Sequence, residues 1–245
     1  MSRRLVPRTT MTKTNPNGRR TKAKQAAIKA AGFDKLKAYP INEAVELAKK
    51  MNMAKFDASV EVHFNLGIDP RKGDQQIRSA LSLPHGTGKQ IKDCAFVAPE
   101  NEEACRQAGA DLVGGEELIE TILKTGKTDF QVAVAEPMMM RNLAKIAKIL
   151  GTRGLMPSPK NETVTANPAQ AVAELKKGKI SYKNDDTGNL HMIIGKVSFD
   201  SAKLAENFQA IVDTVRKNKP SAAKGLFIKN AVITTAMGPG IKVSL

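Results

Sequence analysis

The chain has 245 residues and a mass of 26.4 kDa, a size that favours one large domain or two modest ones. Lys and Arg outnumber Asp and Glu by 39 to 24, and the resulting net charge of +15 favours a polyanionic partner. A hydrophobic fraction of 41% excludes wholesale disorder. No apolar run approaches the roughly 18 residues that span a bilayer, so we expect a soluble, cytoplasmic protein with no membrane partner. Cys94 and Cys105 form neither a disulfide framework nor a zinc cluster.

The positive charge is concentrated at the two ends of the chain. Residues 1–37 form a basic arm with eleven Lys or Arg and one Asp, whereas residues 38–86 and 87–178 are each neutral. Residues 179–245 carry an excess of five positive charges. Because exposed charges are screened beyond about 10 Å, a phosphate backbone should be attracted mainly to the two ends. The arm also has the composition of an organellar transit peptide, although Pro7, Pro16 and Gly18 interrupt the amphipathic helix that such a peptide needs.

The first elements after the arm are a helix and an alternating strand. Asn42 is predicted to cap a helix that runs to Met53. In residues 59–68 every even position is apolar and every odd position is polar or Gly, which predicts a strand with one buried face. The outer face is either solvated or a recognition surface, and it carries Ser59, Glu61, His63 and Asn65.

The middle of the chain changes to a different pattern after Pro84, Gly86 and Gly88, which indicate a linker or hinge. Strands alternate with helices there, and this order predicts parallel βαβ units. The predicted strands lie within 91–98, 111–113 and 130–135, and the predicted helices at 101–108, 116–124, 137–150 and 168–177.

The last third of the chain returns to strands around one long helix. Residues 179–183 and 189–194 flank the turn sequence 185–188 and predict a hairpin. An apolar stripe predicts a helix at 201–217, followed by strands at 227–235 and 241–245 on either side of a turn at 237–240.

Motifs for catalysis, metal binding and cofactor binding are missing from the sequence. Residues 86–89 (GTGK) resemble a phosphate-binding loop, but Leu83 replaces its first glycine and Gln90 replaces the hydroxyl residue that binds magnesium. The histidines are isolated and have no ligand spacing; they are His63, His85 and His191. We therefore expect no enzyme activity, no cofactor and no metal site.

Aromatic residues make up only 4% of the chain, and Trp is absent, which disfavours a stacking platform for single-stranded nucleic acid. Phe56 is the one aromatic residue placed next to the alternating strand. Its residue type favours a core position over a ring displayed toward a base or ribose.

Several segments together resemble the ribosomal protein L1 family, the protein of the mobile stalk of the large ribosomal subunit. The resemblance runs from about Ala38 to Leu245. It is carried by AKFDASVEVH at 54–63, LGIDPR at 66–71, SLPHGTGK at 82–89, AGADLVGGE at 108–116, ILGTRGLMPSPK at 149–160, GKVSF at 195–199 and MGPG at 237–240.

The resemblance implies an α/β fold of two domains. An RNA-binding outer domain, an α+β two-layer sandwich, would be formed from residues 38–86 plus 179–245. A Rossmann-like three-layer α/β domain without a nucleotide would be inserted at 87–178, with crossings near Gly86 and Gly178. Because the outer domain would contain both chain ends, this division agrees with the charge distribution.

The resemblance also implies the residues that bind RNA. Short polar groups would recognise the shape of a folded RNA through ribose hydroxyls and base edges, while lysines attract phosphate. The family usually has Thr in place of Ala236, and Thr235 could supply the missing hydroxyl only after a backbone shift. The implied RNA-binding residues are Lys55, Phe56, Ser59, Glu61, Lys196, Ser198, Thr235, Met237 and Gly238.

The implied partners are the stalk rRNA of the large subunit and the exit-site tRNA, whose release after deacylation the family assists. Many bacterial members also repress translation of their own mRNA. A cytoplasmic ribosome is favoured over an organellar one. The alternatives are a Rossmann-like enzyme with a basic appendage and a general RNA chaperone without preference for one fold.

Overall fold

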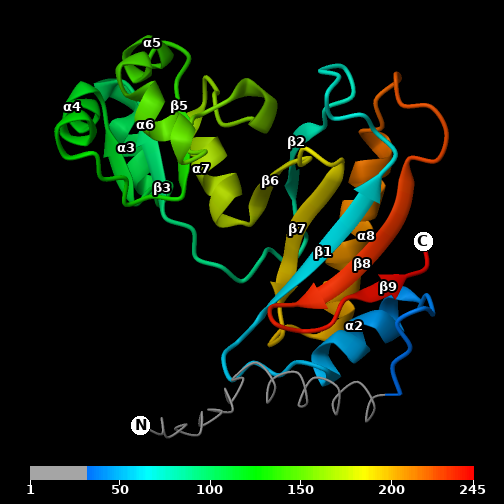
Figure 1. Ribbon diagram of the computed structural model, residues 1–245. Helices are drawn as coiled ribbons and strands as arrows, with labels where there is room; N and C mark the ends of the chain where they lie inside the picture. The colour runs from blue at the N-terminus through cyan, green and yellow to red at the C-terminus, as the bar shows by residue number, and fades with distance from the viewer. Residues whose placement is uncertain (1–31) are drawn as a thin grey trace, which may run out of the picture.

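The computed structural model describes residues 32–245, and most of the basic arm, with Pro7, Pro16 and Gly18, lies outside the described residues. The described chain forms two lobes (Figure 1). Residues from both ends of the chain build one lobe, and the middle of the chain builds the other. We call them the outer lobe and the inserted lobe.

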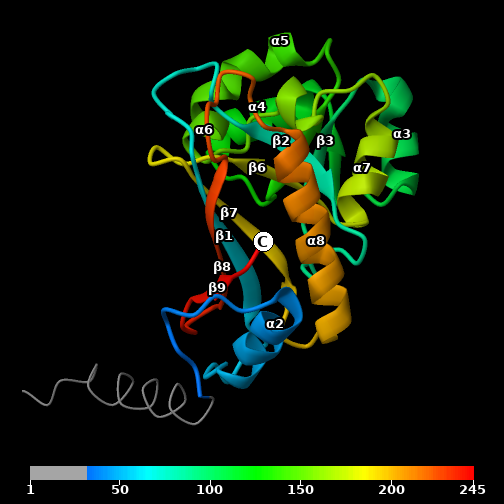
Figure 2. The same cartoon turned by 90° about the vertical axis from the view of Figure 1, so that its right-hand side faces the viewer.

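The outer lobe is built on a four-stranded antiparallel sheet in the order β7-β1-β8-β9. A second, two-stranded sheet pairs β2 with β6. Helices α2 and α8 cover one face of the larger sheet, and Figure 2 shows its opposite face bare. The elements are α2 (Ile41–Lys50), β1 (Ser59–Leu66), β2 (Arg78–Ser82), β6 (Lys179–Lys183), β7 (Asn189–Lys196), α8 (Ser201–Lys217), β8 (Ile228–Thr235) and β9 (Ile241–Val243).

The alternation of apolar and polar residues in β1 allows one face of the sheet to pack against the helices, so the outer lobe has a sheet layer and a helix layer. Val60, Val62 and Phe64 are buried in one apolar core with Leu204 and Phe208 of α8. The polar residues between them face the bare side, as the sequence pattern predicted.

Helix α2 begins two residues earlier than predicted, and it ends at Lys50 instead of Met53. Pro40, in extended conformation, is its N-cap, and Asn42 lies inside the first turn instead of capping it. The fixed backbone of proline is compatible with a helix start, so no side-chain cap is needed to define this end.

The inserted lobe has three layers. Its parallel sheet has the order β4-β3-β5, and β3 is buried on both faces. Cys94 and Phe96 belong to a core with α4, α5 and α6, whereas Ala95 and Val97 belong to a separate core with α3 and α7. These layers confirm the predicted Rossmann-like arrangement. The elements are β3 (Asp93–Phe96), α3 (Pro99–Gln107), β4 (Leu112–Gly114), α4 (Glu116–Thr125), β5 (Val132–Ala135), α5 (Met140–Leu143), α6 (Ala147–Thr152) and α7 (Pro168–Lys176).

The single helix predicted at 137–150 is wrong. The segment forms α5, then a 3₁₀ turn at Ala144–Ile146, then α6. Leu143, Ile146 and Leu150 are all buried in the same core. Apolar residues spaced by three and four fit a 3₁₀ turn as well as an α-helix, so the pattern could not distinguish them.

The predicted hairpin at 179–194 is only partly correct. The turn forms, because the Asp185 carboxylate accepts hydrogen bonds from the backbone N–H groups of Thr187 and Asn189 at 3.0 and 2.6 Å. The two strands then separate: β7 pairs with β1, and β6 pairs with β2. Strand β2 was missed, since it is partly exposed and has no apolar alternation.

We propose that the two domains meet at Gly86 and Gly178. Both glycines have positive φ, 63° and 105°. A Cβ atom added to Gly178 would lie 2.5 Å from the Cα of Gly86, so the two connecting segments touch where no side chain fits. The proposed boundaries are therefore 38–86 plus 179–245 for the outer domain and 87–178 for the inserted domain.

An ion-pair cluster joins β3, β4 and α7 at the lower edge of the inserted sheet. The Lys176 Nζ atom lies 2.6 Å from Asp93 Oδ1 and 2.6 Å from Asp111 Oδ2. Burial raises the pKa of the Asp93 carboxyl. The hydrogen bond from Lys176 lowers the pKa of Asp111 to about 2.

We expect Asp111 to make the stability of the protein depend on acid. Its folded pKa is below the unfolded value of about 3.9, so its contribution is present above about pH 4 and is lost as the pH falls through about 2. Asp111→Asn should flatten the fall in unfolding free energy across this window, measured by urea unfolding. Asp129→Asn, at an exposed site, is the control, and an unchanged slope for Asp111→Asn would contradict the prediction.

Candidate nucleic-acid interface

Three segments that are distant in sequence meet at one corner of the bare sheet face. Ser59, at the start of β1, pairs with Lys196, at the end of β7. On the other side of β1, the Ala236 N–H donates a 2.9 Å hydrogen bond to the Ser59 carbonyl. Residues 55–61, 196–198 and 234–238 therefore form one corner surface, at the lower end of β1 in Figure 1.

Phe56 is displayed at this corner, contrary to the core position that its residue type favoured. The side chain is 60% exposed, and Lys55 beside it is exposed as well. The core below is already filled by Met51, Ala58 and Val60, each fully buried. An exposed aromatic ring next to a lysine is suited to stacking on a base while the cation attracts phosphate.

Asp57 ties the segment that carries Phe56 to the end of β7. Its carboxylate accepts hydrogen bonds from the Ser198 N–H at 3.1 Å and the Ser198 Oγ at 2.9 Å. The Lys196 Nζ atom lies 3.8 Å from the same carboxylate. Ser198 and Lys196 are therefore at the corner, but both are already engaged by Asp57.

The turn after β8 presents Met237 in a strained conformation. Met237 has φ of 74° and is 62% exposed. The Gly238 N–H donates to the Thr235 carbonyl at 2.8 Å, and a Cβ on Gly238 would lie 2.2 Å from Thr235 Oγ1. The turn therefore requires glycine at 238, and it projects the Met237 side chain outward. A non-glycine residue with positive φ is often found at functional sites.

Thr235 does not lie on the surface, so it could contact RNA only after the backbone shift that the sequence analysis required. It lies opposite Val60, its side chain points to the buried face of the sheet, and it is only 2% exposed. Thr234, opposite Glu61, is the hydroxyl residue whose side chain points to the outer face of the sheet. The sequence analysis missed it. The alternation within 228–235 was the signal that could have identified it.

We expect Met237→Gly to separate stability from binding. Relief of the left-handed conformation should stabilise the fold by up to about 1 kcal/mol, in urea unfolding, because glycine has no Cβ clash there. RNA affinity should fall, since the projecting side chain is lost. A destabilised variant would mean that the Met237 side chain supports the turn.

A histidine pair lies on the same face of the sheet. His63 is the next residue of β1 after Glu61 whose side chain points to this face. His63 and His191 are directly opposite each other on β1 and β7, and their Nδ1 atoms are 2.8 Å apart. Burial, followed by the proximity of His191, lowers the pKa of His63, while Glu61 raises it. The sequence analysis had treated the three histidines as isolated.

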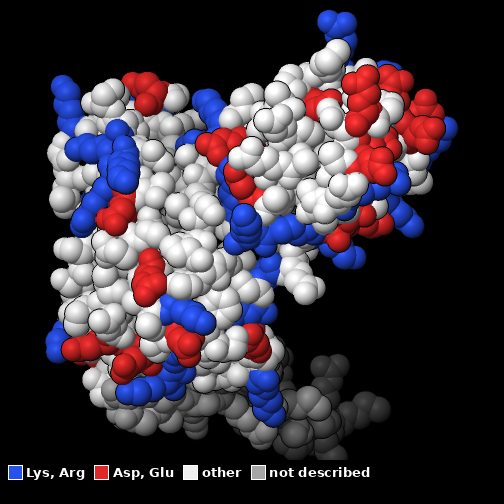
Figure 3. All heavy atoms as spheres, turned by 180° about the vertical axis from the view of Figure 1, so that it is seen from behind, with Lys and Arg blue, Asp and Glu red and all other residues white. Residues whose placement is uncertain are grey.

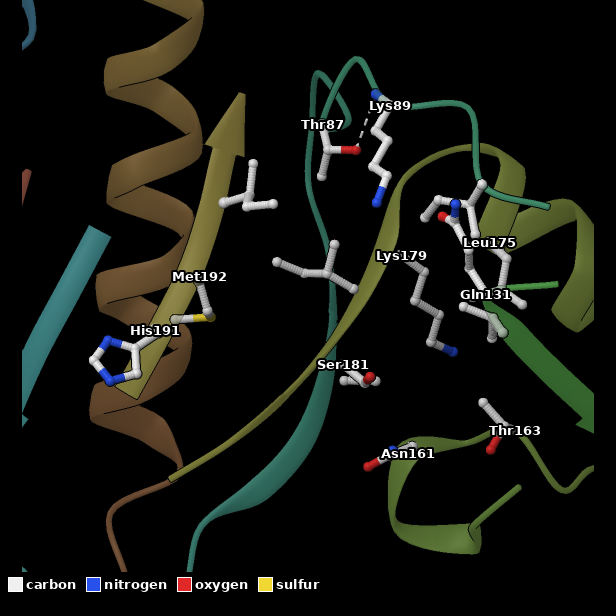
Figure 4. Close-up of a pocket in the computed structure, with 15 residues that line it drawn as sticks. Thr87, Lys89, Gln131, Asn161, Thr163, Leu175, Lys179, Ser181, His191 and Met192 are labelled. Carbon is white, nitrogen blue, oxygen red and sulfur yellow. Dashed lines mark hydrogen bonds between the residues drawn. The ribbon is translucent and has the colours of Figure 1, made fainter. Parts of the chain in front are cut away.

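A cavity of about 310 Å³ lies between the lobes, bordered by β6 and β7 on one side and the inserted sheet on the other (Figure 4). Lys89 and Thr87 come from the connecting segment, and Asn161 and Thr163 from the inserted lobe. Lys179 is held by Glu162 and by Glu174, at 2.5 and 2.8 Å. Its charge is therefore already balanced.

The inserted lobe places its own carboxylate where a Rossmann-like enzyme would hold phosphate. The carboxyl ends of β3 and β5 form the switch point of the sheet. The buried Glu136 carboxylate there accepts hydrogen bonds from the Ala98 N–H at 3.1 Å and Asn101 Nδ2 at 2.6 Å, at the start of α3. The adjacent groove, about 830 Å³, is lined by more acids than bases: Glu102, Glu116 and Glu117 against Arg106, which lies 3.5 Å from Glu102.

The surface charge of the described residues is mixed rather than uniformly basic. Acidic side chains gather over α3 and α4, at the far end of the inserted lobe (Figure 3). At the corner surface, Lys55 and Lys196 are matched by Asp57 and Glu61. The corner itself is therefore suited to recognition of shape more than to long-range attraction.

Two further searches of residues 32–245 bear on function. They include no group of three or more His, Cys, Asp or Glu side chains arranged to hold a metal ion. None of their helices combines the length and apolar character that a membrane crossing requires.

The fold defines a mixed α/β protein with an antiparallel and a parallel sheet, and comparison with known proteins gives its family. The sequence pattern of the Ribosomal protein L1p/L10e family matches residues 47–239. The chain belongs to this family, and it is accordingly a structural ribosomal protein and not an enzyme.

Named relatives extend the match beyond the family pattern. The large ribosomal subunit protein uL1 of Kosmotoga olearia is 54% identical over 210 residues, which cover 86% of this chain and 90% of the relative. The uL1 protein of Mycoplasma capricolum is 54% identical over 210 residues, covering 86% and 92%. That of Thermosipho melanesiensis is 52% identical over 211 residues, covering 86% and 91%.

Proposed function

We propose that the chain is a constituent of the large ribosomal subunit that binds the stalk rRNA through its corner surface. The observation that carries this proposal is the display of Phe56 and Met237 at one exposed corner, beside Ser59 and Glu61. No element within residues 32–245 covers these large apolar side chains, and they lie next to polar groups that can bind ribose and base edges. Family membership supports rRNA as the partner.

Recognition at the corner is by shape. Glu61 would repel phosphate, so its carboxylate is suited to accept hydrogen bonds from a ribose hydroxyl or a base amino group. Ser59 and Thr234 lie beside Glu61 on the outer face of the sheet. Long-range attraction comes from the basic arm, since the corner carries as many acids as bases.

The binding proposal is tested by sedimentation with large subunits that have been stripped of the chain. The wild-type chain should co-sediment with one copy per subunit, and subunits whose stalk rRNA is truncated should not retain it. Equal retention by intact and truncated subunits would contradict the assignment of the stalk.

The inserted domain provides a second body that moves with the stalk, and we propose that it assists release of deacylated tRNA from the exit site. The two connecting segments that meet at Gly86 and Gly178 attach this body to the RNA-binding lobe. Ribosomes lacking the chain should release labelled deacylated tRNA more slowly in stopped-flow fluorescence. An unchanged release rate would remove this part of the proposal.

The same surface would bind any RNA element of the same shape, including one in the chain's own mRNA. Translational repression then follows from competition between the two RNAs for one corner. A stalk-like mRNA fragment should displace the rRNA fragment completely, and simultaneous binding of both would contradict a shared site.

A further inference from the structure

The three histidines of the chain differ in their surroundings, and two of them form a cross-strand pair. His63 and His191 are cross-strand partners on the bare face of the outer sheet. Their side chains are 31% and 53% exposed, so an ion can reach them from solvent. His85 lies elsewhere, paired with Glu206 of α8.

The separation of the two Nδ1 atoms is short enough for both to bind one ion. Ligand nitrogens at about 2.0 Å from a metal are about 2.8 Å apart when the angle between them is a right angle, and about 3.3 Å apart in a tetrahedral site. The observed separation is 2.8 Å. It therefore fits neighbouring positions of a square-planar or octahedral ion that favours imidazole, such as Cu²⁺ or Ni²⁺.

The other nitrogen of each ring faces a carboxylate. Glu61 Oε2 is 3.8 Å from His63 Nε2, and Asp185 Oδ2 is 3.5 Å from His191 Nε2. Metal-bound histidines usually donate their second N–H to such an acceptor. At these distances the two carboxylates act by charge and are close enough to accept those hydrogen bonds after a small movement of the rings. Asp185 is itself held in place by Thr187 and Asn189.

Neither residue that lies directly opposite His63 on the neighbouring strands is a lysine or arginine. The residues that pair with His63 are His191 on β7 and Val232 on β8. Without an ion, the 2.8 Å contact is a hydrogen bond in which one Nδ1–H donates to the other Nδ1.

We propose that His63 and His191 form a two-histidine site for a divalent transition-metal ion, with water completing the coordination shell. When the ion binds, the histidine that carried its proton on Nδ1 changes tautomer and carries it on Nε2, so both rings stay neutral and no net proton is released. The ion would lie beside the corner surface, held by side chains that the proposed RNA contacts do not use, apart from the supporting Glu61.

The test is calorimetric titration of the full-length, tag-free chain with Ni²⁺. Competing sites are few, because the remaining histidine is His85 and both cysteines are buried. The wild-type chain should bind one equivalent, His63→Ala and His191→Ala should each lose this binding, and His85→Ala should keep it. Circular dichroism checks that each variant is folded.

A spectroscopic measurement identifies the ligands directly. With one equivalent of Cu²⁺, the electron paramagnetic resonance spectrum should show coupling to two nitrogens in the wild-type chain and in His85→Ala. Coupling to fewer than two nitrogens, absence of saturable Ni²⁺ binding by the wild type, or binding that persists in His63→Ala and His191→Ala would each overturn the proposal.

Discussion

Phe56→Ala is expected to weaken binding of a stalk rRNA fragment by about 5- to 150-fold, the equivalent of about 1–3 kcal/mol for one stacked base. The ring is 60% exposed and contributes little to the core, so the thermal midpoint of the protein should not change. Fluorescence anisotropy with a labelled fragment measures the affinity.

The matched control is Leu123→Ala, which removes another exposed apolar side chain, on α4 of the inserted lobe. It should leave the affinity unchanged. If both variants bind as tightly as the wild type, the corner surface is not the RNA site. If Phe56→Ala also unfolds the protein, the ring has a structural role that its exposure does not reveal.

Gly238→Ala should disturb both stability and binding. The added Cβ would lie 2.2 Å from Thr235 Oγ1, and a clash of this kind typically costs about 1–3 kcal/mol. The turn must shift to relieve it, which moves Met237 away from its position at the corner. Urea unfolding and RNA affinity should therefore decline together.

A second substitution, at Thr235, should compensate for this clash. Thr235→Ala removes the atom that the new Cβ meets, and that hydroxyl makes no hydrogen bond in the structure. The double variant Gly238→Ala, Thr235→Ala should therefore be more stable than Gly238→Ala alone and should regain RNA binding. A double variant no better than the single one would show that the clash is not the cause.

Elements with strong local patterns could be predicted from the sequence. The strict alternation of β1 and the long apolar stripe of α8, at Ser201–Lys217, are both present as expected. The parallel sheet of the inserted lobe also follows from the order of strands and helices. These features depend on residues that are close together in the chain.

Features that depend on distant residues could not be predicted from local pattern. The separation of β6 from β7 is decided by their partners β2 and β1, and no signal in 179–194 shows this. The exposure of Phe56 depends on a core already filled by Met51 and Ala58. The histidine pair joins positions 128 residues apart, so only the strand register brings it together.

The sequence also located most of the corner surface correctly in space, although the roles of its residues stay predictions. Ser59, Lys196 and Met237 meet there because β1 pairs with β7 and lies beside the turn after β8. Thr235 points to the buried side of β8, so its RNA contact still depends on a backbone shift.

The most direct test of the central claim is competition between the stalk rRNA fragment and a plain RNA duplex of equal length and composition, measured from low to high salt. Both affinities should fall steeply with salt, because the basic arm attracts phosphate in either RNA. The preference for the stalk fragment should persist, since the corner surface recognises its shape. Equal affinity for the two RNAs at every salt concentration would contradict this account and favour a general RNA chaperone.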